Sequence, residues 1–522
     1  MSLRRQLAEL LVLRCSGHLL DQQRRYPQWE ASNAELQHWL AEGVGGVILL
    51  GGSAAELALR CRQLQQWAST PLLLCADVEE GVGQRFEGAS WLVPPLALGR
   101  VHQRNPAEAI ELARAYGRCS GMEAHALGLN WVLGPVCDVN NNPANPVINV
   151  RAWGETPESA AELSRAFTEG LQGSGVLGCA KHFPGHGDTA SDSHLELPLI
   201  PHSLQRLNAV ELPPFKAAID AGVASVMTAH LLLPALDPKR PATLSPAVLE
   251  QLLRKELGFS ALVVTDALVM EAISSRYGAG EAAALAFEAG ADLILMPADA
   301  NAALDALEAG FRSGRFTSAR LEQSLKRRRT ALARTLPAPV TAQEGLDQLA
   351  AMAAEHSALS HQLLEQSLEF KGQGPPAGPG LNLIRVDNSL NCPALPLQAP
   401  ALIRPAQLGF RPRLIDDLAG PLEMHSLGDE PVLLQLLVRG NPFRGNADGG
   451  NPWQRLVRQL LEQQRLAGLA VYGSPYLWRE LSALLPQDLP AAYSPGQMPA
   501  AQEVVLQAMG VGNSTNDSGF TD

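Results

Sequence analysis

The sequence predicts an α/β protein in which an N-terminal (β/α)8 barrel of the TIM type is followed by a smaller α/β domain. Eight short apolar runs alternate with helical segments over the first three hundred residues. Charged residues and histidines follow the carboxyl ends of several of these runs. An open, doubly wound sheet accounts for the same number of strands, so the position of the polar residues is what favours the barrel.

The apolar runs have the continuous character expected of strands that are buried on both faces. They span residues 11–15, 46–50, 71–75, 129–133, 176–180, 224–228, 261–265 and 292–296. The segments between them, such as PAEAIELARAYGRCSGMEAHAL, are amphipathic and rich in Ala, Leu and Glu. The chain therefore repeats a strand and a helix eight times, which is the number of units in a (β/α)8 barrel.

The barrel pattern stops near residue 335, so we expect the catalytic domain to span 1–335. The next segment, 336–380, opens with the linker-like TLPAPVTAQ, continues as a long helical pattern to about Phe370 and ends in the loop KGQGPPAGPG. Residues 381–510 predict the smaller α/β domain, with strands LNLIRV, PVLLQLLV and LAGLAVYG and the helix WQRLVRQLLEQQ. The polar residues 511–522 predict a disordered tail.

Composition excludes several classes of function. The net charge of -12 leaves no basic face for a nucleic acid. No apolar run reaches the roughly 20 residues that a membrane span needs, and Glu9 and Arg14 interrupt the N-terminal apolar stretch, so we expect no signal peptide and no membrane partner. Seven cysteines without a C-x-x-C pair suit a reducing compartment, with the cytoplasm as the default. The sequence leaves open whether the protein is a monomer or an oligomer.

Polar residues with catalytic potential follow five consecutive strands. In a barrel the carboxyl ends of all strands meet at one mouth, where active sites are built. The residues expected at this mouth are Asp77 and Arg85 after the third strand, Asp138 and Arg151 after the fourth, Lys181 and His182 at the fifth, His230 after the sixth and Asp266 after the seventh.

The segment AKHFPGHGDTASDSH, residues 180–194, has three interpretations. H-x3-H-x-D superficially resembles a metal site, but the segment lacks the usual metal-ligand spacings and Lys181 adds a positive charge, so we predict no metal and no cofactor. His186 and Asp188 are best explained as residues that shape a Gly/Pro turn. Asp192 beside His194 is suited to proton transfer, because a carboxylate can fix the tautomer of an imidazole; an ordinary surface turn is the alternative.

Asp266 ends an apolar strand and can act as a nucleophile or an electrostatic stabiliser, whereas a helix N-cap is its structural alternative. A carboxylate and an acid/base on different loops make a double-displacement glycosidase conceivable. Cationic and imidazole groups could donate to sugar hydroxyls and Asp77 could accept from them, although each charged group could also be a salt-bridge partner. The candidate donors are Arg85, Arg151, Lys181 and His182.

These segments resemble glycoside hydrolase family 3, in its β-N-acetylglucosaminidase (NagZ-type) branch. The resemblance covers about residues 5–335 and rests on segments that occur in the family's order. They are ADVEEGVGQRF, NPVINVRAWGETP, KHFPGHGDTASDSH, MTAHLLLPALDPKRPATLS and VVTDALVM. The segment VEEGVGQRF departs from the family at Glu80, where Gly is usual, and at Val82, where a basic residue is common, while Asp77 and Arg85 keep their separation.

The resemblance implies that Asp266 is the nucleophile and that His194, paired with Asp192, is the acid/base. It also implies a sugar subsite lined by Asp77, Arg85, Arg151, Lys181, His182 and His230. The expected function is that of an exo-acting, retaining β-N-acetylglucosaminidase that hydrolyses terminal non-reducing N-acetylglucosamine from peptidoglycan-derived fragments or related glycosides.

Alternative functions remain open. A neutral imidazole does not repel an anionic acceptor, so phosphate could replace water and make the protein a β-N-acetylglucosaminide phosphorylase. A β-glucosidase of the same family is a further possibility, and a sugar-binding protein without catalysis is the alternative from another class.

Overall fold

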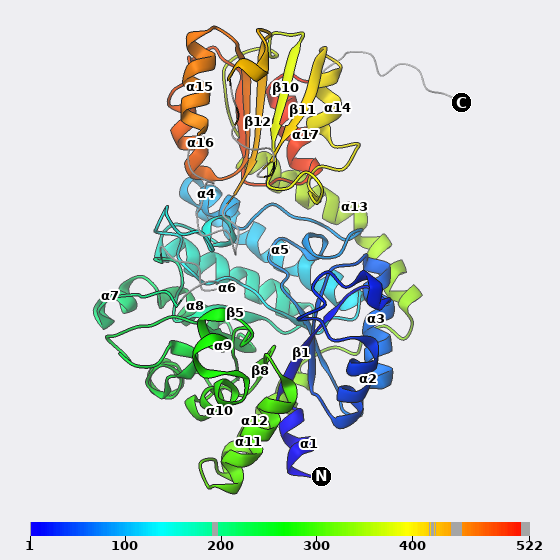
Figure 1. The fold of residues 1–522 in the computed structure, drawn as a ribbon, viewed down its shortest axis with the longest axis vertical. Coiled ribbons are helices and arrows are strands. Elements are labelled where there is room, and N and C mark those ends of the chain that lie inside the picture. The colour runs from blue at the N-terminus through cyan, green and yellow to red at the C-terminus, as the bar shows by residue number, and fades with distance from the viewer. Residues whose placement is uncertain are drawn as a thin grey trace. The chain divides into compact units, whose positions relative to one another are not determined.

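The computed structural model describes residues 2–189, 197–416, 418, 422, 424–439 and 452–512 (Figure 1). The chain divides into two compact units between Ser360 and His361, within helix α13 (Ala342–Ser367). In the described part of the chain, no helix is both long and apolar enough to cross a membrane.

The described residues of the N-terminal unit form eight parallel strands, each at a position predicted from the sequence. They are β1 (Leu11–Ser16), β2 (Gly46–Leu50), β3 (Leu73–Ala76), β4 (Trp131–Val132), β5 (Cys179–Phe183), β6 (Ser225–Thr228), β7 (Leu262–Val264) and β8 (Ile294–Leu295). The strands pair in the orders β4-β3-β2-β1-β8 and β5-β6-β7. Parallel bridges Trp131–Leu177 and Val264–Leu293 connect the two sheets at both ends. The ring is therefore closed, which confirms the predicted barrel against an open sheet.

Helical segments follow each strand and surround the barrel. They are α2 (Asn33–Glu42), α3 (Ala54–Trp67), α4 (Leu96–Arg104), α5 (Pro106–Ala126), α6 (Pro157–Gly173), α7 (Leu204–Ala209), α8 (Pro213–Asp220), a π-helix at Ala247–Glu256, α9 (Glu271–Tyr277), α10 (Ala279–Ala289), α11 (Ala300–Arg312) and α12 (Ser318–Leu332); α1 (Leu3–Ala8) precedes β1. Capping residues determine where several of these helices begin. Ser32 and Ser53 form capping boxes with Glu35 and Glu56, which satisfy backbone N–H groups in the first turns of α2 and α3.

The C-terminal unit contains a six-stranded sheet in the order β11-β10-β12-β13-β14-β9, in which only β9 is antiparallel. Its strands are β9 (Glu369–Lys371), β10 (Gly380–Arg385), β11 (Phe410–Ile415), β12 (Val432–Val438), β13 (Leu466–Gly473) and β14 (Ala491–Ser494). Helices α15 (Trp453–Glu462) and α16 (Pro475–Ser482) lie on one face, and α14 (Pro400–Ala406) and α17 (Pro499–Ala508) lie on the other (Figure 1). This arrangement confirms the predicted α/β character.

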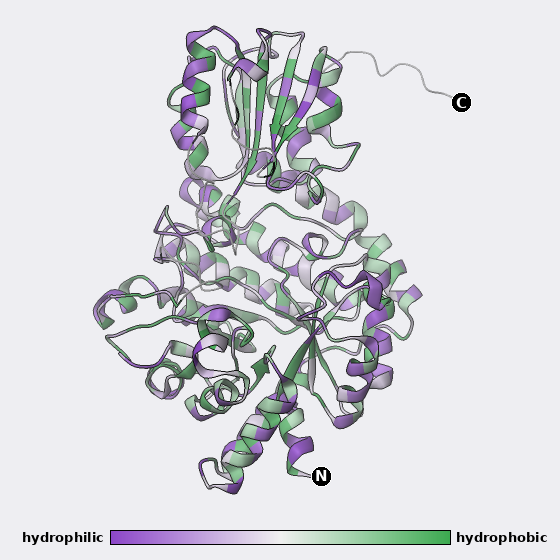
Figure 2. Ribbon diagram, viewed as in Figure 1, coloured by the Kyte–Doolittle hydropathy of each residue, from purple (hydrophilic) through white to green (hydrophobic). Residues whose placement is uncertain are grey.

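Side-chain burial explains the sheet of the C-terminal unit. Every residue of β12 and β13 is buried, and the apolar face of α15 packs against them through Leu456, Val457 and Leu460. Figure 2 shows the resulting pattern, with apolar strands and with polar and apolar residues alternating along α15. Of the predicted tail, Val511 is buried, and residues 513–522 lie outside the described part of the chain.

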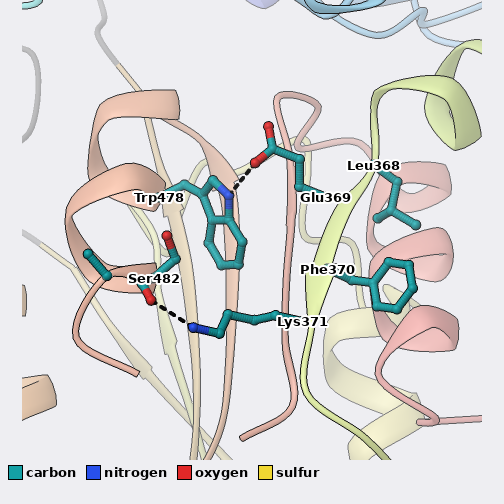
Figure 3. Close-up of a pocket in the computed structure, with 7 residues that line it drawn as sticks. Leu368, Glu369, Phe370, Lys371, Trp478 and Ser482 are labelled. Carbon is teal, nitrogen blue, oxygen red and sulfur yellow. Dashed lines mark hydrogen bonds between the residues drawn. The ribbon is translucent and has the colours of Figure 1, made fainter. Parts of the chain in front are cut away.

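A groove of about 520 Å³ lies in the C-terminal unit between β9 and α16 (Figure 3). Trp478 donates its indole N–H to Glu369 Oε2 over 2.6 Å. Lys371 Nζ donates to the backbone oxygens of Ser482 and Leu485 at 3.0 and 3.2 Å. These contacts fasten the edge strand to the carboxyl end of α16, and none of the lining residues is a predicted site residue.

Candidate active site

The parallel strands bring the predicted polar residues to the mouth of the barrel. Lys181 and His182 lie on β5 itself, and Asp77 and Asp266 directly follow the ends of β3 and β7. Because the strands are parallel and the ring is closed, their carboxyl ends share this mouth.

A largely buried network of charges, in which Asp77 is half-buried, joins residues of the loops after β3 and β4 with Lys181 on β5. Lys181 Nζ lies 2.6 Å from Asp77 Oδ1 and 2.6 Å from Glu79 Oε1. Arg151 contacts the same Glu79 carboxylate with two N–H groups, Nε to Oε2 at 2.7 Å and Nη2 to Oε1 at 2.8 Å. Arg85 Nε donates to the backbone oxygen of Asp77 over 3.2 Å. Two carboxylates therefore hold the cationic groups together at one place.

The charges in this network stabilise one another against the cost of burial. Burial by itself would raise the pKa of Glu79, but Arg151 and Lys181 outweigh it and hold that pKa well below its usual range. The pKa of Asp77 is likewise lowered by Lys181 and Arg85 in spite of burial. The pKa of Lys181 is raised, because Asp77 and Glu79 outweigh the desolvation of its ammonium. The groups are thus ionised at neutral pH.

Asp138 organises the two histidines of the β5 loop. Its Oδ2 lies 2.7 Å from His182 Nδ1, and its Oδ1 accepts the backbone N–H groups of His182 and His186 at 3.3 and 2.7 Å. A carboxylate only accepts, so His182 Nδ1 carries the proton and Nε2 becomes an acceptor unless the ring is protonated. Asp138 therefore fixes both the orientation and the tautomer of His182.

His186 and Asp188 make local contacts of the kind expected for residues that shape the loop. His186 is buried and its Nδ1 lies 2.9 Å from Thr189 Oγ1. Burial lowers the pKa of His186 to about 4, so this ring is neutral at physiological pH. Asp188 pairs with His202 Nε2 at 2.9 Å and with Arg206 Nη2 at 3.4 Å.

Asp266 is half-buried and held by its surroundings. The backbone N–H of Ala267 donates to Asp266 Oδ1 over 2.7 Å. Helix α9 begins only at Glu271, with Met270 in the capping position, so Asp266 is not its N-cap. The backbone N–H of Asp266 donates to Thr228 Oγ1 over 3.4 Å, which connects the end of β7 to the end of β6.

His230 is fully buried beside the Asp266 loop. Its Nε2 lies 3.1 Å from the backbone oxygen of Ala267, and its Nδ1 lies 2.8 Å from Thr243 Oγ1. These contacts connect His230 to the backbone that carries Asp266. Asp192 and His194, the expected acid/base pair, lie outside the described residues.

Sequence reasoning missed Glu79, and it expected Asp138 at the mouth without assigning it a role in the site. Glu79 stands two positions after Asp77, a spacing that places both side chains on one side of an extended segment. Asp138 was noted only because it follows the fourth strand. The signal available for both was the same: an acidic residue just past the end of a buried strand, which needs a cationic or imidazole partner when it is buried.

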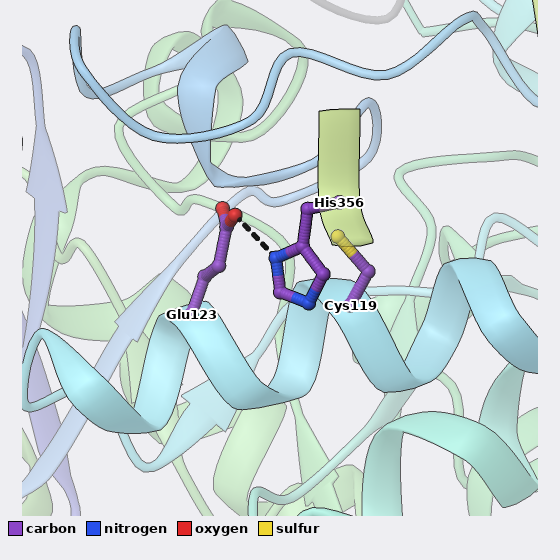
Figure 4. A group of neighbouring side chains, drawn as sticks. All are labelled: Cys119, Glu123 and His356. Carbon is purple, nitrogen blue, oxygen red and sulfur yellow. Dashed lines mark hydrogen bonds and ion pairs between the residues drawn. The ribbon is translucent and has the colours of Figure 1, made fainter. Parts of the chain in front are cut away.

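Two groups of potential metal ligands lie among the described residues, and neither contains a predicted site residue. Cys119 and Glu123 on α5 meet His356 on α13 (Figure 4). Glu123 Oε1 lies 2.7 Å from His356 Nδ1, and the Glu123 carboxylate also accepts the hydroxyl and backbone N–H of Ser90. This group therefore forms a hydrogen-bonded connection between the two helices. The second group is Asp188, His202 and Glu211.

Comparison with known proteins finds relatives over both units. Residues 2–331 match the model described as "Glycosyl hydrolase family 3 N terminal domain", and residues 377–510 match "Bacterial Glycosyl hydrolase family 3 C-terminal domain". The chain is 35% identical over 278 residues to a beta-hexosaminidase of Nitrosomonas eutropha, covering 52% of this chain and 78% of the relative. A beta-hexosaminidase of Neisseria meningitidis is 37% identical over 267 residues, covering 50% of this chain and 73% of the relative.

A solved structure matches nearly the whole chain. It is the glycoside hydrolase family 3 beta-N-acetylglucosaminidase from Paenibacillus sp., with 31% sequence identity and a TM-score of 0.78. The match covers 98% of this chain and 97% of that chain. The similarity to the curated relatives is confined to about half of this chain, whereas the similarity of fold extends over both units.

Proposed function

Since the chain belongs to glycoside hydrolase family 3, we propose that it is an exo-acting, retaining β-N-acetylglucosaminidase. The observation that carries the proposal is the charge network at the barrel mouth, in which Asp77, Arg151 and Lys181 are held within hydrogen-bond distance of shared partners. Donors and acceptors fixed in this way suit the hydroxyl groups of a sugar ring. The names of the relatives support the same activity.

In the proposed mechanism Asp266 attacks the anomeric carbon while His194, paired with Asp192, protonates the departing glycosidic oxygen. The first bond formed is an ester between Asp266 and the sugar. His194 then takes a proton from water, and the water oxygen displaces Asp266 with a second inversion, so the product retains its configuration. His182, oriented by Asp138, and Arg151 and Lys181 contact the sugar hydroxyls.

The proposed substrates carry a terminal non-reducing N-acetylglucosamine, with fragments of peptidoglycan as the expected source. All seven cysteines are free thiols and six are buried, which supports a reducing compartment. The proposal therefore places the enzyme in the cytoplasm, in the recycling of cell-wall fragments.

The test is turnover of 4-nitrophenyl N-acetyl-β-D-glucosaminide with and without inorganic phosphate, with identification of the sugar product. The proposal expects free N-acetylglucosamine at a rate that phosphate does not change. Sugar 1-phosphate formed faster in phosphate would indicate a phosphorylase instead. Preference for the corresponding glucoside would indicate a β-glucosidase, and binding without release of nitrophenol would indicate a non-catalytic sugar-binding protein.

A further inference from the structure

We propose that Glu79 is a positioning residue that holds Arg151 and Lys181 in place and cancels their charge, so that the sugar site selects an uncharged ring over an anionic one. The inference rests on the proposed function, because it names the substrate class of the same site. Glu79 itself need not touch the sugar for this role.

The geometry of the Glu79 carboxylate supports a positioning role. Its Oε1 is shared by Lys181 Nζ at 2.6 Å and Arg151 Nη2 at 2.8 Å, while Oε2 accepts from Arg151 Nε at 2.7 Å. The Glu79 side chain is 3% exposed and that of Lys181 is 2% exposed. Without the carboxylate, two cations that are now brought together by one oxygen atom would repel each other in a site that water does not screen.

Lys181 and Arg151 have more N–H groups than their contacts within the network use. A lysine ammonium has three N–H groups, and Asp77 and Glu79 take two of those of Lys181. Arg151 has five, of which two contact Glu79 and one, on Nη1, donates to the backbone oxygen of Val147 over 3.0 Å. Each cation therefore has N–H groups left that can donate to a substrate. Because the contacts with Glu79 fix the direction of these groups, they suit neutral hydroxyl oxygens at defined positions.

The balance of charges points to the substrate class. At the mouth, five carboxylates and four permanent cations come together, so a site with all of these groups ionised carries no excess positive charge. The carboxylates are Glu30, Asp77, Glu79, Asp138 and Asp266, and the cations are Arg14, Arg85, Arg151 and Lys181. An anionic sugar would lose its hydration in this site without gaining an uncompensated cation, so the site disfavours it. Removing the charge of Glu79 takes away the carboxylate that pairs with both Arg151 and Lys181, so these two cations can then pair with an anionic sugar and the discrimination weakens.

The experiment compares two substrates in the full-length enzyme, 4-nitrophenyl N-acetyl-β-D-glucosaminide and its 6-sulfate. The measured quantity is the ratio of kcat/KM for the neutral substrate to that for the sulfated one. Steric effects of the sulfate are the same in the wild type and in a Glu79→Gln variant of equal shape, so a change in the ratio reports charge. We expect Glu79→Gln to lower the ratio about 10- to 100-fold, the scale of one charge acting over several ångströms in a partly shielded site, and to raise KM for the neutral substrate.

Two further variants separate charge from position and from stability. Glu79→Asp keeps the charge but shortens the side chain, so it should retain the ratio within about threefold while kcat/KM for the neutral substrate falls. Glu9→Gln is the matched control, since Glu9 also pairs with a buried arginine, Arg328, at 2.9 Å, but precedes β1 at the opposite end of the barrel. It should leave the ratio and KM at wild-type values.

The inference is overturned if folded Glu79→Gln keeps the wild-type ratio, or if Glu79→Asp changes the ratio as much as Glu79→Gln does. If Glu79→Gln does not fold, Glu79→Asp decides alone: a fall in kcat/KM for the neutral substrate with the ratio kept within about threefold supports the inference, whereas a wild-type kcat/KM or a changed ratio overturns it. If the wild type cleaves the neutral substrate and the variants keep the wild-type ratio, only this inference is contradicted. Wild-type enzyme that neither binds nor cleaves either sugar contradicts the proposed function, and this inference with it.

Discussion

At the scale of single residues, the site consists of buried charges that are tolerable only because each has a partner. Lys181 and Asp138 are almost completely enclosed, and each touches an opposite charge or an imidazole within 2.7 Å. A buried ion that loses its partner costs about 3–5 kcal/mol, so these residues depend on one another for both folding and function. Substitutions that keep the shape and remove the charge are therefore the informative ones.

Asp138→Asn should weaken sugar binding, because an asparagine cannot accept from His182 Nδ1 and from both backbone N–H groups with the strength of a carboxylate. We expect kcat/KM to fall about 10- to 100-fold, mainly through KM, which is the scale for partners that orient a functional imidazole. Steady-state kinetics measure this. Asp305→Asn, at an exposed carboxylate that pairs with Arg4, is the control and should match the wild type. Equal kinetics for the two variants would contradict the role of Asp138.

His194→Ala should slow cleavage of a substrate with a poor leaving group by about 10²- to 10⁴-fold, the range for general acid/base catalysis. An aryl glycoside with an acidic leaving group needs little protonation, so the first step on that substrate should be affected less. Pre-steady-state release of nitrophenol, compared with hydrolysis of a disaccharide, measures the difference. If the loss is the same for both leaving groups, His194 is not the acid. His38→Ala, at an exposed histidine, serves as the control.

At the scale of elements, strands buried on both faces were predictable and strands with mixed faces were not. The eight barrel strands and β10, β12 and β13 are mostly apolar because both of their faces are buried. Barrel strands lie between the packed barrel interior and the outer helices, whereas helices cover both faces of the C-terminal sheet (Figure 1). In contrast, β11 contains FRPRLI with exposed arginine and proline, and β14 contains only AAYS. Strand β9 has three residues with an exposed Phe370, and its antiparallel pairing with β14 is a long-range contact that no local pattern encodes.

Two histidines on α13 allow a test of the contact between α13 and α5. His356 is buried against Glu123 on α5, whereas His361 on the same helix has a side chain that is 57% exposed. His356→Ala removes a buried hydrogen-bond partner and should lower the free energy of unfolding of the N-terminal unit by about 1–3 kcal/mol. His361→Ala should change it by less than about 0.5 kcal/mol. Chemical denaturation followed by tryptophan fluorescence measures both, and equal effects would contradict the importance of the His356–Glu123 contact.

At the scale of the whole molecule, the buried groups of the barrel mouth determine how the protein responds to acid. His186 has its pKa lowered to about 4 by burial, from an ordinary value of about 6.5 in an unfolded chain. Between these two pKa values His186 is protonated in the unfolded chain and neutral in the native protein. The free energy of unfolding therefore falls as the pH decreases from about 6.5 to about 4. The lowered pKa values of Glu79 and Asp77 add to the loss below about pH 4.5.

His186→Asn should flatten this dependence between about pH 6.5 and 4, where the wild type should lose roughly 3 kcal/mol from His186 alone. Denaturant midpoints measured across this range give the slope. His38→Asn should keep the wild-type slope, because His38 is exposed. A wild-type slope in His186→Asn would show that another group is responsible.

The sequence was sufficient for the fold class of both units, and it placed most of the polar residues at the barrel mouth because strand ends in a barrel converge. It was not sufficient to predict which of these residues contact one another. The contacts of Glu79 with Arg151 and Lys181 join residues 72 or more positions apart, and the contact of His182 with Asp138 spans 44 positions. Such pairings follow from the closure of the barrel and not from any local pattern.

The proposed mechanism requires that Asp266 forms a covalent bond with the sugar. The most direct measurement is mass spectrometry of the enzyme after reaction with a 5-fluoro N-acetylglucosaminyl donor, whose glycosyl-enzyme hydrolyses slowly, followed by mapping of the labelled peptide. We predict one added glycosyl group, an ester at Asp266, and no label in Asp266→Asn. A label on another residue, or turnover with inversion of the anomeric configuration and no label, would contradict the account.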